Sequence, residues 1–239
     1  MGIRNTKMVN DVNREMLNDF FVIQDLNSFE SLYLLSSMDD KEKHLINLLE
    51  KDTKNKKKIV FIAADPDNYE KTDKYCGLGK KYFEQLDITE FEIVDYRMSK
   101  FAAIRHIETA DILFLNGGDP VNQINFIQEY EIAPLITNFK GVLIGISAGA
   151  MNLAKNAYCS KDKEEGETWL YDGLGLVDVT VDPHFDINNK IQTEELLNSK
   201  IDIIGLPDGS FVKIDKYGTK NIYGTYYIKE KNKIVSKAD

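Results

Sequence analysis

The stretch VLIGISAGAM, residues 142–151, decides the expected fold. Its first five residues are apolar or glycine, as is typical of a strand buried on both faces of a parallel sheet. Gly145, Ser147 and Gly149 then form a Gly-x-Ser-x-Gly pattern that runs into a helix-compatible segment. Such a turn lifts the serine hydroxyl above the sheet, so the stretch predicts a nucleophile elbow. The alternative is a tight strand-to-helix turn in which Ser147 is the N-cap.

Short apolar segments alternate with segments of helical periodicity on both sides of this stretch. Strands are expected at 32–35, 58–63, 92–96, 112–115, 142–146 and 177–181, and helices at 41–49, 74–86 and 121–136. In the helix 74–86, one side is expected to carry the apolar residues Tyr75, Leu78, Tyr82, Phe83 and Leu86. The alternation predicts an α/β fold with a doubly wound, mostly parallel sheet. Turn signals after residue 206 predict antiparallel strands that extend one edge of this sheet.

Composition narrows the class of protein. With 239 residues and 43% hydrophobic residues, the chain is expected to form one α/β domain over 31–239, preceded by an N-terminal extension over 1–30. The net charge of −9 disfavours nucleic acid and anionic membranes as partners. No signal peptide and no apolar run of membrane-spanning length is visible, so a cytoplasmic location is expected, as a monomer or a homodimer. Two distant cysteines predict neither a disulfide framework nor a metal cluster.

A nucleophilic serine needs a base, and the sequence holds three histidines. His44 and His106 lie in charged helical segments where a solvated surface role is expected. His184 instead follows the strand expected at 177–181, after Pro183, which places an imidazole at the carboxyl end of the sheet. His184 is therefore the candidate base.

A carboxylate must orient that imidazole and stabilise its charged form. The loop 160–167, between Ser147 and His184, offers Asp162, Glu164, Glu165 and Glu167. Any one of them would complete the chain order serine, acid, histidine. A second glycine loop, residues 116–120 (NGGDP), follows the strand 112–115 and could supply a backbone N–H to an oxyanion. The alternative for that loop is a purely structural turn with Pro120 at the first helical position. Dinucleotide binding is disfavoured because Gly-x-Gly-x-x-Gly is absent.

Four motifs in this order resemble those of the dipeptidase E and cyanophycinase family of serine peptidases. They are residues 114–119 (FLNGGD), 145–150 (GISAGA), 182–185 (DPHF) and 204–209 (IGLPDG). This family, which includes aspartyl dipeptidases, belongs to the class I glutamine amidotransferase-like superfamily. The resemblance covers about residues 31–228 and implies a flavodoxin-like sheet.

The resemblance also implies roles for individual residues. Ser147 is similar to the family's nucleophile and His184 to its general base, with Gly118 and Ala148 as oxyanion-hole donors. The family's spacing points to Asp162 as the acid, with Glu164 or Glu165 as alternatives. The implied reaction is hydrolysis of a short peptide through an acyl-enzyme, without a metal or an organic cofactor.

The sequence departs from the aspartyl dipeptidases at one point. These enzymes hold the substrate's acidic side chain with an arginine after the histidine strand, whereas residues 186–200 contain only Lys190 and Lys200 as cations. Lysine cannot grip a carboxylate with a planar fork, so specificity for an N-terminal aspartate does not follow. Two other readings stay open: an amidohydrolase or amidotransferase of the same superfamily, and a non-catalytic member that binds a ligand.

Overall fold

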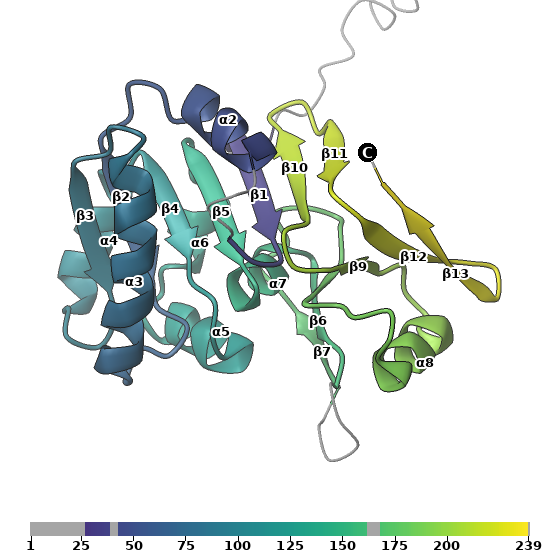
Figure 1. Cartoon of the computed structure of the whole chain (residues 1–239). Helices are drawn as coiled ribbons and strands as arrows, with labels where there is room; N and C mark the ends of the chain where they lie inside the picture. The colour runs from purple at the N-terminus through teal and green to yellow at the C-terminus, as the bar shows by residue number, and fades with distance from the viewer. Residues whose placement is uncertain (1–26, 39–42, 162–167, 239) are drawn as a thin grey trace, which may run out of the picture.

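The computed structural model describes residues 27–38, 43–161 and 168–238 (Figure 1). A mostly parallel sheet forms its centre, with strand order β11-β10-β1-β5-β4-β2-β3. The five parallel strands are β1 (Ser31–Leu35), β2 (Lys58–Ile62), β3 (Glu90–Val94), β4 (Ile112–Leu115) and β5 (Val142–Ile146). The antiparallel edge strands β10 (Phe211–Asp215) and β11 (Lys220–Tyr223) continue the sheet beyond β1.

Helices cover both faces of this sheet, as the sequence predicts. One face packs against α2 (Lys43–Asp52) and α3 (Tyr69–Glu84), whose buried residues include Leu49 and Phe83. Four helices pack on the other face: α4 (Lys100–Glu108), α5 (Pro120–Glu129), α6 (Ala133–Thr137) and α7 (Ala148–Leu153). The central strands β1, β4 and β5 are almost wholly buried, which explains their nearly unbroken apolar sequences.

A smaller sheet lies beside the β11–β10 end of the main sheet (Figure 1). Its order is β13-β12-β9-β8, formed by β8 (Val181–Pro183), β9 (Ile204–Leu206), β12 (Tyr226–Glu230) and β13 (Lys233–Lys237). Helix α8 (Lys190–Asn198) connects β8 to β9 and adds Leu196 to a small core with Phe185 and Ile203. The hairpin of β6 (Asn156–Cys159) and β7 (Trp169–Asp172) forms a third unit.

Three expected features differ from the structure. The helix expected at 121–136 is two helices, α5 and α6, because the backbone at Glu131 has φ 54° and breaks the helix. The expected strand at 177–181 is wrong: Val177 makes only an isolated bridge with Ala154, and pairing begins at Val181. Val177, Val179 and Val181 are nonetheless all buried, so their alternation reflects packing against the core and not a strand ladder. The last strands also divide: β10 and β11 extend the main sheet as expected, whereas β12 and β13 belong to the smaller sheet.

The expected N-terminal extension over 1–30 lies mostly outside the described residues. Within its last part, Phe29 is buried in the core and the Glu30 N–H donates to the Gly141 carbonyl. The division at residue 30 stays a prediction.

Candidate active site

Ser147 occupies a strained turn between β5 and α7. Its backbone has φ 50° and ψ −110°, a conformation that is uncommon outside glycine. The Ser147 side chain makes no capping hydrogen bond to α7, so the plain N-cap alternative does not describe it. Its N–H donates to the Leu35 carbonyl at 2.9 Å, which fixes the turn to the end of β1. Strain held in this way is frequent at active sites.

The elbow also requires glycines for space. A Cβ on Gly145 would lie 2.5 Å from the carbonyl carbon of Gly149, and a Cβ on Gly149 would lie 2.2 Å from the Leu115 carbonyl oxygen. Both distances are far below van der Waals contact. The pattern Gly-x-Ser-x-Gly is therefore needed for α7 to pack directly on β4 and β5.

His184 reaches Ser147 from the smaller sheet. It directly follows β8, has φ 59°, and places its Nε2 3.0 Å from the Ser147 Oγ. That distance is a hydrogen bond, the geometry a general base needs to take the hydroxyl proton. Two residues that are 37 positions apart in the chain thus meet at the edge where β5 and β8 end.

The carboxylate beside His184 is Asp208. It follows β9 in the turn Pro207-Asp208-Gly209, and its Oδ1 lies 2.6 Å from His184 Nδ1. Ser147, His184 and Asp208 therefore form a continuous chain of hydrogen bonds, with the imidazole between hydroxyl and carboxylate. The two side chains of the smaller sheet are half or more exposed, at 51% for His184 and 70% for Asp208, so the site opens to solvent.

Two serines at the end of β1 hold these loops. The His184 N–H donates to the Ser36 Oγ at 2.8 Å, and the Ser36 hydroxyl lies 3.5 Å from Asp208 Oδ1. The Gly209 N–H donates to the Ser37 Oγ at 3.0 Å. The main sheet thereby fixes the position of both His184 and Asp208.

The glycine loop after β4 lies against the elbow. A Cβ on Gly117 would be 3.4 Å from the Ser147 Cβ. Gly118 has φ 144°, and a Cβ there would lie 2.2 Å from Asp65 Oδ2, so only glycine fits. The loop is also the turn expected as the alternative, because Asp119 caps α5 and Pro120 is the first residue of that helix. Ala148 is the first residue of α7, where a backbone N–H has no acceptor within the helix.

Asp162, Glu164 and Glu165 are outside the described residues, so their part in the site stays a prediction. Asp208 was missed, although it stands in one of the four motifs that carry the resemblance. The available signal was an aspartate in a Pro-Asp-Gly turn at the end of an apolar strand. The other histidines lie apart from the site, His44 on α2 and His106 on α4 with its Nδ1 3.6 Å from a Glu92 carboxylate oxygen.

A cleft of about 920 Å³ contains Ser147, His184 and Asp208. Its walls include the segment 36–38 that follows β1, the glycine loop and one side of α3. Among the described residues, the lysines that line it are Lys71 and Lys81, both from α3, and the sequence did not single out either one. Lys190 and Lys200 do not line it. Over residues 27–38, 43–161 and 168–238, no group of three His, Cys, Asp or Glu side chains could hold a metal ion.

Comparison with known proteins gives consistent matches. The model of peptidase family S51 matches residues 32–222. A peptidase E from Nostoc sp. is 28% identical over 188 residues, which cover 70% of this chain and 75% of that protein. The crystal structure of a peptidase E candidate from Listeria monocytogenes EGD-e is 20% identical and superposes with a TM-score of 0.56, covering 87% of this chain and 98% of that one. The last match concerns the fold alone. In the described part of the chain, no helix is both long and apolar enough to cross a membrane.

Proposed function

Because the chain belongs to peptidase family S51, we propose that it is a serine peptidase that hydrolyses short peptides through Ser147. The observation that carries this proposal is the hydrogen-bonded chain from the Ser147 Oγ through His184 to Asp208. A hydroxyl is a weak nucleophile at neutral pH, and a neighbouring base is the common way to activate it.

In the proposed mechanism, Ser147 Oγ attacks the scissile carbonyl while His184 Nε2 accepts the hydroxyl proton. Asp208 holds the imidazole in the required tautomer and stabilises its charged form. His184 then protonates the leaving amine, and an acyl-enzyme remains on Ser147. A water molecule, deprotonated by His184, hydrolyses this ester and restores the serine.

The negative charge on the carbonyl oxygen needs backbone donors. We assign this role to the N–H groups of Gly118 and Ala148, because the glycine loop lies against the elbow and Ala148 begins a helix. Loss of one such donor typically costs about 10² to 10³ in kcat. We further propose that the enzyme acts in the cytoplasm, as a monomer or a homodimer, on peptides small enough for the cleft.

The test uses a library of dipeptides and tripeptides with the full chain and with Ser147→Ala, Asp208→Asn, Asp162→Asn, Glu164→Gln and Glu165→Gln. We expect Ser147→Ala to abolish turnover and labelling by a fluorophosphonate, because the nucleophile is lost. Asp208→Asn should lower kcat by about 10⁴, since the asparagine favours the wrong imidazole tautomer. The three loop variants should retain activity within a few-fold. Full activity in Asp208→Asn, with loss in a loop variant, would instead assign the acid to that loop.

A further inference from the structure

One side of helix α3 presents apolar side chains to the cleft. Tyr75, Leu78 and Tyr82 lie three and four residues apart, which places them in one stripe along the helix. All three line the cleft that contains Ser147. Tyr75 is 46% exposed and Leu78 is 56% exposed, although both are large and apolar.

The adjacent stripe of α3 packs against the main sheet. Thr72, Cys76, Gly79 and Phe83 are buried and pack toward the sheet. A Cβ on Gly79 would lie 2.9 Å from the Phe61 ring, so the helix sits as close to β2 as it can. Tyr82 also packs against this core at one edge, so Tyr75 and Leu78 are the members of the stripe that the core leaves exposed.

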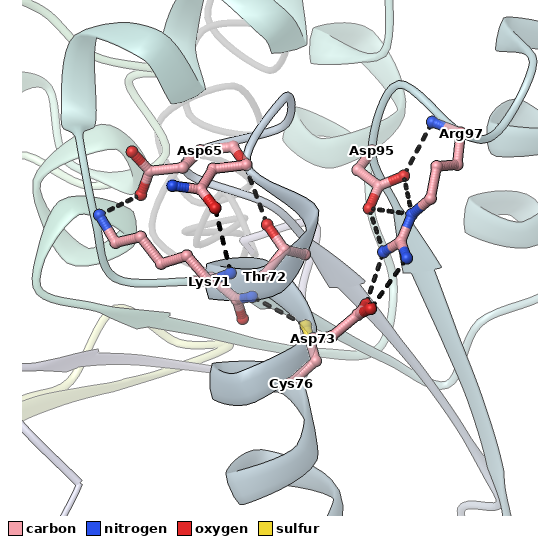
Figure 2. A network of polar contacts seen from close by, with 9 residues as sticks. Asp65, Lys71, Thr72, Asp73, Cys76, Asp95 and Arg97 are labelled. Atoms are coloured by element: carbon pink, nitrogen blue, oxygen red, sulfur yellow. Dashed lines mark hydrogen bonds and ion pairs between the residues drawn. The ribbon is translucent and has the colours of Figure 1, made fainter.

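Polar contacts hold the start of α3 in place (Figure 2). The Lys71 Nζ lies 2.6 Å from Asp65 Oδ2, and the Thr72 hydroxyl donates to the Asp65 carbonyl. Further along, Arg97 bridges Asp73 and the buried Asp95. These contacts tie the helix to the ends of β2 and β3, so the stripe is a fixed wall of the cleft.

The charges of this wall do not favour an acidic ligand. Lys71 is already paired with Asp65, whose side chain is only 15% exposed. Lys81 has a long flexible stem, which lets its ammonium group stay in water. Tyr75 and Leu78 leave exposed apolar surface on this wall of the cleft, and exposed apolar surface in a cleft typically marks a ligand site.

We infer that the α3 stripe of Tyr75, Leu78 and Tyr82 is a specificity site that selects short peptides with a large apolar side chain next to the scissile bond. This inference rests on the proposed function, because the cleft is defined by Ser147. A leucine or phenylalanine side chain of the substrate would cover Tyr75 and Leu78 and remove their apolar surface from water. Burial of one such side chain corresponds to about a tenfold to hundredfold gain in binding.

The first test compares kcat/KM for Leu-Leu, Ala-Ala and Asp-Asp in the full chain, in Leu78→Ser and in Tyr75→Ser. We expect Leu-Leu to exceed both other dipeptides by about tenfold or more. Each variant should lower kcat/KM for Leu-Leu by about tenfold and change Ala-Ala by less than about twofold. Phe101→Ser is the matched control, because Phe101 is 71% exposed on α4 and does not line the cleft. A preference for Asp-Asp, or an equal loss for all dipeptides in the α3 variants, would overturn the inference.

A second measurement separates this inference from the proposed function. Binding of the same dipeptides to Ser147→Ala is measured by calorimetry, without turnover. Tighter binding of Leu-Leu than of Asp-Asp, lost in the double variant with Leu78→Ser, supports the α3 site even if no peptide is hydrolysed. Hydrolysis with no preference for Leu-Leu would leave the peptidase intact and reject the α3 site. Absence of binding for every dipeptide would reject it as well.

Discussion

Two residues of the site could be predicted from single motifs, and the third could not. Ser147 was predicted because a strand followed by Gly-x-Ser-x-Gly leaves few backbone geometries. His184 was predicted because it is the histidine that follows an alternating apolar segment and a proline, although that segment is not a strand over 177–180. Asp208 follows β9, 24 residues after His184, and only the pairing of β8 with β9 brings the two together. The familiar order of serine, acid and histidine pointed instead to the loop 160–167.

One buried carboxyl near the site has no part in the proposed mechanism. Asp182 lies two residues before His184 and is 2% exposed. It accepts a hydrogen bond from the Ser160 N–H at 3.3 Å. Burial, with a smaller contribution from the nearby Glu195, raises the pKa of Asp182 to about 7. The folded protein therefore holds this proton at pH values where an unfolded chain has released it.

This pKa shift predicts a pH dependence of stability. An unfolded aspartate releases its proton near pH 4, and the folded state keeps the Asp182 proton to about pH 7. The folded state binds more protons between these values, so its stability falls as pH rises through this window and stays lower above it. Asp182→Asn should remove this fall. Between pH 4.5 and pH 8, the free energy of unfolding of the parent should fall by at least about 1.4 kcal/mol more than that of the variant. This difference is the equivalent of one pKa unit.

Urea unfolding at both pH values measures this difference. Taking the difference between variant and parent cancels the titration of the remaining carboxyls. Asp182→Asn could instead change the free energy of unfolding equally at pH 4.5 and pH 8. That result would show that the Asp182 carboxyl is already ionised in the folded state at pH 4.5, and that a raised pKa is the wrong explanation.

At the scale of elements, most strands of the main sheet and most helices that cover it could be predicted. Their burial on one or two faces gives a regular spacing of apolar residues along the sequence. The α3 stripe could not be predicted in the same way. Helical periodicity places Tyr75, Leu78 and Tyr82 on one apolar side with Phe83, whereas the structure buries Phe83 and leaves Tyr75 and Leu78 in the cleft. Periodicity detects apolar residues on a helix but does not distinguish a core from a ligand as their partner. The same ambiguity explains why the strand expected at 177–181 is wrong: its alternating valines are buried without forming a strand ladder.

The packing of α7 on the sheet gives a prediction at this scale. Gly149→Ala would place a Cβ 2.2 Å from the Leu115 carbonyl oxygen, so the helix must move away from β4. We expect a loss of about 1–3 kcal/mol in the free energy of unfolding. Displacement of the elbow should also lower fluorophosphonate labelling of Ser147. Denaturant unfolding and labelling rates measure the two effects.

Gly77→Ala in α3 is the matched control. A Cβ there meets nothing within 4 Å, and alanine is the better helix former. In this variant the free energy of unfolding should rise by about 0.5–1 kcal/mol, and the rate of fluorophosphonate labelling at Ser147 should stay unchanged. Equal effects from the two substitutions would mean that close packing at Gly149 is not what the elbow requires.

At the scale of the whole molecule, the site depends on two sheets that meet. Ser147 comes from the end of β5 in the main sheet, whereas His184 and Asp208 follow β8 and β9 in the smaller one. The sequence indicated one extended sheet, because strand pairing between distant segments leaves no local pattern. Ser36 is one of the residues that join the two parts: it is fully buried, directly follows β1, and contacts both the His184 N–H and the Asp208 carboxylate.

Ser36 should therefore act as a positioning residue. Ser36→Ala removes the acceptor for the His184 N–H, so His184 loses its fixed distance to Ser147. We expect kcat to fall by about 10² with little change in KM, because a displacement of about 1 Å can cost that much in rate. The loss of stability should be only about 1 kcal/mol, as for one hydrogen bond. Steady-state kinetics and urea unfolding of the same preparations measure both.

Ser28→Ala is the control, because the Ser28 hydroxyl donates to the Thr137 carbonyl at 2.9 Å, away from the cleft. It should show a similar loss of stability and unchanged kcat. The pH dependence of kcat gives a further readout, since a mobile imidazole should alter the profile in Ser36→Ala and not in Ser28→Ala. If both variants lose stability equally and neither changes kcat or its pH profile, then the contact between the two sheets at Ser36 supports the fold alone, and His184 is held to Ser147 by Asp208 and the strained backbone after β8.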